Sequence, residues 1–254
     1  ELKTLLADGR KKLDAPMPEL DARQPAWEAQ WRGKLSEGWT VLKPESVKST
    51  NGTEFTVNAD NSVLARGANP AKDIYEVKLK LGAGNLAAVR LEALPHESLP
   101  LKAAGRADDG NFRLSEFEAE IIYPGTNAKP VKIKFTQALA DSARAGNEAA
   151  LAIDAKPETG WQADTNGLTD AHAVLFLPAE PLAIKPDATL KAALKFEAST
   201  SKRAIGHFRL SAAQNDELVQ LLAPPKAEPW QVLGPFKTES TLAGFTNVFP
   251  PETA

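Results

Sequence analysis

The sequence contains no cysteine, a single methionine and only three histidines among its 254 residues. Without cysteine, the chain can form no disulfide, thiolate metal site or cysteine nucleophile, and the usual indication of a redox compartment is missing. So few histidines also leave little scope for imidazole-based metal binding or acid–base catalysis. These absences narrow the available chemistry to carboxylates, hydroxyls, amides and basic side chains.

Long apolar runs and an excess of basic charge are absent too. No segment approaches the roughly 18 consecutive apolar residues that cross a bilayer, and 30 basic against 33 acidic side chains leave a formal net charge of −3. We therefore expect neither a membrane span nor binding to nucleic acid. The start, Glu1-Leu2-Lys3, is neither an initiator methionine nor a signal peptide, so we expect a processed product or a piece of a longer protein.

The short motifs of common enzyme classes are missing. The sequence has no Gly-x-Ser-x-Gly, phosphate-binding Gly-x-x-x-x-Gly-Lys, dinucleotide-binding Gly-x-Gly-x-x-Gly or zinc-binding His-Glu-x-x-His. His96, His172 and His207 have no second ligand type at a metal-binding spacing, so we expect structural or surface roles for them. We predict that the chain is not an enzyme. A Ser-His-Asp triad assembled from distant segments stays open, because geometry defines such triads.

Residues 1–36 are predicted to form a helical arm, since they are rich in Leu, Glu, Gln, Ala and Arg. Pro16 and Pro18 divide this arm in two. Trp27 and Trp31 are four residues apart and share one helix face. That face either docks onto a neighbouring surface or forms a platform for a ligand.

Residues 38–213 are predicted to form an all-β domain, a β-sandwich or jelly roll. Short β-branched or alternating segments are separated by Asn-Gly, Gly-Asn and Asp-Gly turns, without the regular strand–helix alternation of a parallel sheet. Alternation is clearest from Tyr75 to Leu81, where apolar residues occupy every second position. The predicted strands are residues 40–42, 45–49, 54–57, 63–66, 74–81, 88–93, 113–122, 131–137, 173–176, 189–196 and 205–212.

Residues 214–254 change in character again. A short helical run at 214–222 is followed by a stiff Ala-Pro-Pro-Lys linker, which places a boundary near Pro224. The tail beyond this linker contains one predicted strand, Trp230 to Phe236, which is too little to fold alone. We expect it to dock or to begin a further domain.

Two turns carry side chains that are able to bind a ligand. The first, Ala152 to Trp161, holds Asp154 and Thr159 beside a Trp, which suits ligation of a hard cation or stacking on a sugar ring. The alternative is a plain turn in which Trp161 caps the core. The second, Gly105 to Asn111, is either a polar glycine-rich turn or a loop that contacts a ligand or calcium.

Several segments, in order, resemble one family. They are Trp39-Thr-Val-Leu-Lys-Pro, Asn61-Ser-Val-Leu-Ala-Arg-Gly, Val89-Arg-Leu-Glu-Ala-Leu-Pro-His-Glu-Ser-Leu-Pro, Gly105-Arg106, Gly110-Asn-Phe-Arg-Leu-Ser-Glu-Phe-Glu, Ala152-Ile-Asp, Gly160-Trp161 and Ile205-Gly-His-Phe-Arg-Leu-Ser. This pattern, spanning about residues 39–212, resembles a region of large secreted planctomycete-type proteins that carry cytochrome c-like haem domains and domains of unknown function. The stretch from Trp230 to Glu252 is similar to the segment that comes next in such proteins.

The resemblance implies a non-haem β-sandwich related to the galactose-binding-like sandwiches of carbohydrate-binding modules and discoidin domains. In those modules an Ile-Asp-Gly turn and a Ser-Glu strand hold a structural calcium ion, a role that would fall to Asp154 and Glu116 here. Two departures weaken the equivalence: Ala155 replaces the usual Gly, and the two motifs occur in the reverse order. The chain has no Cys-x-x-Cys-His, so haem binding is not carried over.

We therefore predict a non-catalytic module of a larger exported protein, secreted or periplasmic, that binds carbohydrate or packs between domains such as a cytochrome c-like neighbour. The predicted ligand-binding residues are Trp161, Arg106 and Asn111, and the predicted calcium ligands are Asp154 and Glu116. The alternative function is a structural or assembly subunit that docks on a partner through its terminal arms.

Overall fold

The computed structural model describes residues 2–13, 15, 18–125, 129–164, 169–198, 202–222, 237–239 and 246–248. The chain forms two compact units, residues 1–223 and 224–254. Within the second unit, β15 (Lys237–Glu239) pairs with β16 (Thr246–Val248) in antiparallel fashion. The predicted strand from Trp230 to Phe236 lies outside the described residues.

The N-terminal segment is helical, as the sequence predicts. It forms α1 (Leu2–Leu13) and α2 (Pro18–Glu37). Pro18 opens α2, where a missing backbone N–H leaves no hydrogen bond unmade, and Glu19 and Asp21 place negative charge in the first turn. The Trp27 side chain is 59% exposed. Among the described helices, none combines the length and the apolar character required to cross a membrane.

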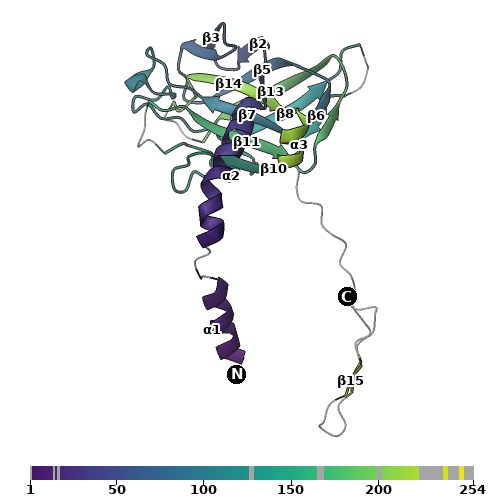
Figure 1. Ribbon diagram of the computed structural model, residues 1–254. Helices are drawn as coiled ribbons and strands as arrows, with labels where there is room; N and C mark the ends of the chain where they lie inside the picture. Colours follow the sequence, from purple (N-terminus) through teal and green to yellow (C-terminus); the bar gives the residue numbers. More distant parts are fainter. Residues whose placement is uncertain are drawn as a thin grey trace. The chain divides into compact units, whose positions relative to one another are not determined.

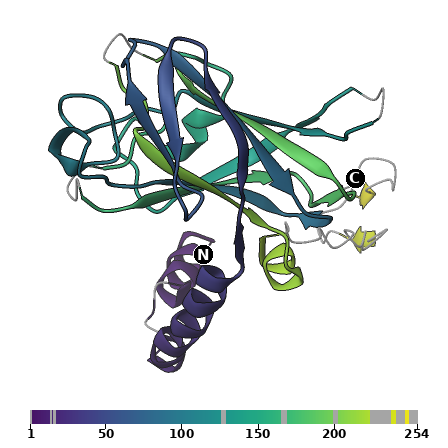
Figure 2. The same cartoon turned by 90° about the horizontal axis from the view of Figure 1, so that it is seen from above.

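Two antiparallel sheets form a sandwich, which confirms the predicted fold class. Figure 1 shows them as two layers, and Figure 2 shows the same layers from above. The larger sheet has the order β10 (Phe135–Ala140), β11 (His172–Pro178), β7 (Ala88–Ala93), β14 (His207–Ala213), β4 (Val63–Gly67), β3 (Thr53–Val57), and β1 (Trp39–Val41) also pairs with β14. The smaller sheet has the order β2 (Pro44–Ser49), β5 (Asp73–Leu81), β13 (Ala188–Phe196), β8 (Glu116–Ile122), β9 (Val131–Ile133).

Shorter elements complete this unit. The strands β6 (Gly84–Leu86) and β12 (Leu182–Ile184) form a separate two-stranded ladder. The single turns η1 (Pro100–Lys102) and η2 (Ala149–Ala152) lie in connections between strands, and α3 (Asp216–Leu222) comes after the last strand of the sandwich. The helix predicted at 214–222 is therefore present.

Period-two alternation produces the core between the sheets. Along β5 and β13 every second side chain is buried, as the sequence predicts for Tyr75 to Leu81. Aromatic rings join the two layers: Phe117 of β8 stacks on Phe176 of β11 at 4.1 Å between ring centroids, and Tyr75 stacks on Phe208 of β14 at 6.1 Å. Such contacts add to the roughly 1.5–3 kcal/mol gained by burying each large apolar side chain.

The segment predicted as one strand at 131–137 contributes to both sheets. It divides at Lys134, so that β9 joins the smaller sheet and β10 joins the larger one. Ile133 and Phe135 both pack with the core, on either side of this crossing. Alternation alone shows no break here, because the apolar period continues through the change of sheet.

A buried polar cluster links the sheets at the β2 side of the smaller sheet, away from the β9 side where the chain crosses between sheets. The Asp73 carboxylate of β5 accepts hydrogen bonds from Ser49 Oγ at 2.7 Å, Thr53 Oγ1 at 2.6 Å and the Asn51 backbone N–H at 3.1 Å. The Arg106 guanidinium donates to Thr53 Oγ1 at 3.1 Å and to the carbonyls that end β4. This cluster therefore joins β2 and β5 of one sheet to β3 and β4 of the other.

We predict that Asp73→Asn lowers the free energy of unfolding by about 2–4 kcal/mol, because an amide NH₂ would face hydroxyl and N–H donors in a buried site. Urea unfolding measures the change. Glu76→Gln, on the exposed face of the same strand, is the matched control and should shift it by less than about 1 kcal/mol. Equal effects of the two substitutions would contradict a linking role for Asp73.

Candidate functional site

The turn from Ala152 to Trp161 is seated against the start of β8. Leu114 and Trp161 exchange two backbone hydrogen bonds, of 2.9 Å and 2.8 Å between N and O. Gly160, which precedes Trp161, has a φ of +154°, and a Cβ there would lie 2.4 Å from the Leu114 carbonyl oxygen. A glycine is therefore required for the turn to approach the strand this closely.

Asp154 organises this turn from within. Its Oδ1 accepts hydrogen bonds from the Lys156 backbone N–H at 3.0 Å and from Thr159 Oγ1 at 2.9 Å. Between them, Ala155 has a φ of 62°, in the left-handed region that favours glycine. Alanine therefore occupies a backbone conformation at this position that glycine would adopt with less strain.

Glu116, the other predicted metal ligand, lies beside Asp154. Its side chain is only 7% exposed, and its Oε1 atom has no hydrogen-bond partner among the described residues. The pKa of Glu116 is raised to about 7, mainly by burial and also by the neighbouring Asp154 carboxyl, against the opposing effects of the Lys156 backbone N–H and Lys195. Two carboxyl groups in contact, one of them buried, favour a shared proton or a bound cation.

The donor set for a cation is small. No group of three or more His, Asp or Glu side chains suited to hold a metal ion occurs in the described part of the chain. Calcium takes six to eight oxygens, and backbone carbonyls and water often supply several of them. The buried, unpartnered Oε1 of Glu116 is the atom that a cation at this turn would satisfy.

Trp161 is fully buried, which corrects the expectation that it stacks on a sugar ring. Its Nε1–H donates to the Ser142 carbonyl at 2.9 Å, and its ring packs edge-to-face on Phe112 at 5.1 Å between centroids. Stacking requires an exposed ring face, and this ring offers none. Trp161 instead caps the core, the alternative that the sequence left open.

Arg106 and Asn111 are buried as well, at 8% and 7% exposure. The Arg106 guanidinium is bonded to Thr53 and to the carbonyls of Gly67 and Ala68, so its donors serve the link between the sheets. The Asn111 backbone N–H donates to Asp109 at 3.1 Å within its turn. Their expected role as exposed sugar contacts therefore does not match their positions, although Arg106 also lines a hollow at the end of β4.

Ser62 and His207 are in contact, as the serine and histidine of a Ser-His-Asp triad would be. His207 Nε2 lies 2.9 Å from Ser62 Oγ, but Ser62 Oγ also donates to Asp60 Oδ1 at 2.6 Å. The carboxylate therefore contacts the serine and not the imidazole, whose Nδ1 faces the Pro95 carbonyl. Ser62 is 1% exposed, so no substrate reaches its hydroxyl. Burial lowers the pKa of His207 in this network.

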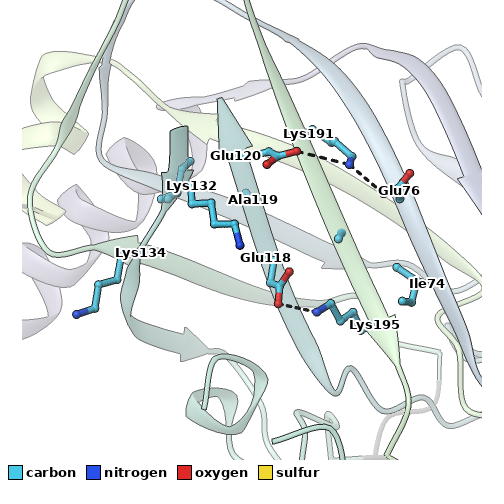
Figure 3. Close-up of a pocket in the computed structure, with 11 residues that line it drawn as sticks. Ile74, Glu76, Glu118, Ala119, Glu120, Lys132, Lys134, Lys191 and Lys195 are labelled. Carbon is cyan, nitrogen blue, oxygen red and sulfur yellow. Dashed lines mark hydrogen bonds and ion pairs between the residues drawn. The ribbon is translucent and has the colours of Figure 1, made fainter. Parts of the chain in front are cut away.

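The outer face of the smaller sheet carries a shallow groove of about 540 Å³, shown in Figure 3. It forms over Ala193 of β13, whose cross-strand neighbours Glu76 and Glu118 have long side chains. Lys191 bridges Glu76 at 2.9 Å and Glu120 at 3.5 Å. No aromatic side chain lines the described groove, so it lacks a stacking platform for sugars. Exposed ion pairs of this kind contribute little to stability.

A second hollow, of about 510 Å³, lies between the end of β4 and the loop after β7, and we call it the loop-end pocket. Its lining comprises Ala65, Arg66, Gly67, Asn69, His96, Ser98, Leu99, Pro100 and Arg106. Leu101 and Lys102 come directly after this lining, with φ angles of 53° and 57°. Two consecutive left-handed residues other than glycine are strained, and such strain is concentrated at functional loops.

Sequence reasoning did not identify this pocket as a site. The Leu-Pro-His-Glu-Ser-Leu-Pro segment that forms one wall contributes only to the family resemblance, and Asn69 is not among the predicted ligands. The two walls are about 30 residues apart in the chain, and only the pairing of β4 and β7 with the common neighbour β14 brings them together. Arg106 is the one predicted ligand residue that lines the pocket.

Comparisons with known proteins give little beyond the fold. No family model matches the chain, and no curated protein matches it significantly. A solved structure from a study of the promiscuous specificity of carbohydrate-binding modules of the β-sandwich superfamily is similar over 70% of this chain, with 12% identity and a TM-score of 0.24. The chain spans 55% of the length of that protein.

The raised pKa of Glu116 predicts a pH-dependent stability. Because its folded pKa of about 7 exceeds the ordinary value of 4.5, the folded state binds the extra proton, and stability falls as pH rises from about 4.5 through 7. Glu116→Gln should remove this loss and be more stable than the parent by about 2–3 kcal/mol at pH 8, with a smaller gain at pH 5. Urea unfolding of both proteins at each pH measures the difference, and a gain independent of pH would contradict it.

The left-handed backbone at Ala155 predicts that a glycine at this position makes the protein slightly more stable. Ala155→Gly relieves the Cβ strain but adds freedom to the unfolded chain, so we expect a net stabilisation of up to about 1 kcal/mol. Thermal unfolding provides the measurement. Ala193→Gly, in the interior of a strand, is the contrasting substitution and should destabilise. Destabilisation by Ala155→Gly would show that the turn does not hold this conformation.

Proposed function

We propose that the chain is a non-catalytic β-sandwich module of a larger exported protein and that it binds carbohydrate at the loop-end pocket. The pocket volume of about 510 Å³ supports this, since it lies within the roughly 300–1,000 Å³ of small-ligand sites. The pocket combines polar side chains with an apolar wall at Leu99 and Pro100. A non-catalytic role agrees with the buried position of Ser62, the serine that contacts both His207 and Asp60.

We further propose that Asp154 and Glu116 hold a calcium ion that fixes the turn from Ala152 to Trp161. The ion would supply positive charge in place of the shared proton and satisfy the buried Glu116 Oε1. Its role is structural, because the turn seats Trp161 in the core and lies apart from the residues that line the loop-end pocket.

A second candidate function is assembly on a partner through the N-terminal arm. Leu6, Leu20 and Trp27 expose 61%, 55% and 59% of their surface, and large exposed apolar side chains favour docking. A cytochrome c-like domain is the neighbour that the family resemblance suggests. Size-exclusion chromatography of the full chain and of residues 38–254 tests this function, and identical behaviour with the partner present would count against it.

Carbohydrate binding is tested by affinity electrophoresis in gels that contain single polysaccharides, neutral and acidic. The proposal predicts retardation of the full chain in at least one gel. Asn69→Ala, a substitution in the pocket, should reduce retardation at least fivefold, whereas Lys134→Gln in the outer groove should leave it unchanged. Unretarded migration in every gel would remove the carbohydrate-binding function.

Calcium binding predicts a stabilisation that depends on pH. A calcium ion competes with the proton that Glu116 binds, so 5 mM calcium should raise the unfolding midpoint by several degrees at pH 8 and by much less at pH 5. Glu116→Gln should abolish the calcium effect. Asp170→Asn, at a carboxylate outside this turn, is the control. No shift at pH 8 would refute the site.

A further inference from the structure

The loop-end pocket has an excess of hydrogen-bond donors and no carboxylate in its described lining. Arg66, near the end of β4, is exposed and forms no hydrogen bond or ion pair with any described residue, including its cross-strand neighbour Glu54. Arg106 also lines the pocket; its guanidinium is bonded to carbonyl and hydroxyl oxygens, and it reaches Asp73 only through Thr53. The described lining therefore contains two arginines and no acidic side chain.

His96 adds a third donor, and its surroundings fix the tautomer. Its Nδ1 atom accepts the Ser98 backbone N–H at 3.1 Å and lies 2.8 Å from Ser98 Oγ. A backbone N–H can only donate, so the proton of the neutral ring is on Nε2. That Nε2–H group has no partner among the described residues and is available to a ligand.

Asn69 holds two segments of the pocket wall together. Its Nδ2 atom donates to the carbonyls of Arg106 at 2.8 Å and Lys202 at 3.3 Å, which fixes the orientation of the amide. Its Oδ1 atom is buried and has no partner in the described part of the structure. Asn69 therefore fixes the position of the pocket wall through its amide N–H groups, and its buried oxygen does not face the ligand.

We infer that the pocket binds an acidic sugar, a uronate residue of a polysaccharide. The carboxylate would bind Arg66 and His96 Nε2–H, and the apolar side of the sugar ring would lie against the wall formed by Leu99 and Pro100. A neutral sugar leaves Arg66 and the His96 Nε2–H without an acidic partner, and a simple anion leaves the apolar wall uncovered. This inference rests on the proposed carbohydrate-binding function and specifies its substrate class.

Isothermal titration of the full chain with a tetragalacturonide and with its methyl ester tests the inference, because the ester keeps the sugar rings and removes the carboxylate charge. The acid should bind at least tenfold more tightly than the ester. Arg66→Gln should weaken acid binding at least tenfold and ester binding less than twofold. Acetate at the same carboxylate concentration should not compete. Thermal unfolding confirms that Arg66→Gln, at an exposed residue, stays folded.

The double substitution Lys132→Gln, Lys134→Gln is the matched control. It also removes positive charge, but from two lysines that line the outer groove. If this pair weakens acid binding and Arg66→Gln does not, the site lies elsewhere and the inference fails. Equal binding of acid and ester overturns the acidic-sugar inference but leaves carbohydrate binding intact. Binding of neither probe, with no retardation by any polysaccharide, overturns both.

Discussion

The buried hydrogen-bond cluster centred on Asp73 is the constraint on which the arrangement of the sandwich depends. A carboxylate that is 1% exposed must find donors, and it finds them in Ser49 and in Thr53, which belong to different sheets. Thr53 Oγ1 also accepts a hydrogen bond from Arg106, whose guanidinium donates to the carbonyls at the end of β4. The same contacts that hold the layers together therefore position one wall of the loop-end pocket and the charge beneath it.

The two candidate sites place polar groups in different environments. At the turn around Asp154, two acidic groups meet with little solvent, so one charge must be neutralised by a proton or a cation. At the loop-end pocket, basic side chains line the hollow and no acidic side chain does, so the deficit is of negative charge. The first arrangement favours a role in holding a loop, and the second favours a role in recognition, which allows structure and function to be separated by mutation.

Strand positions were predictable because one face of each strand is buried and the apolar period is two, as from Tyr75 to Leu81. The three-residue strands β6 and β12 were not predicted, since three residues are too few to show a period. The contact of Glu116 with Asp154 was expected from resemblance and not from spacing. The burial of Trp161 was one of two open alternatives, because a Trp in a turn has the same sequence signature whether it faces the core or solvent.

The pairing of β1 with β14 has a consequence for how such a sandwich is accommodated in a longer chain. Trp39, at its beginning, is the direct cross-strand partner of Ala213, at its end. Facing residues in an antiparallel ladder have Cα atoms about 4.5–5.5 Å apart. A host polypeptide interrupted by this domain would therefore resume almost where it left off, at the same separation as two neighbouring strands. A surface hairpin of another protein could carry the whole sandwich without changing its own geometry.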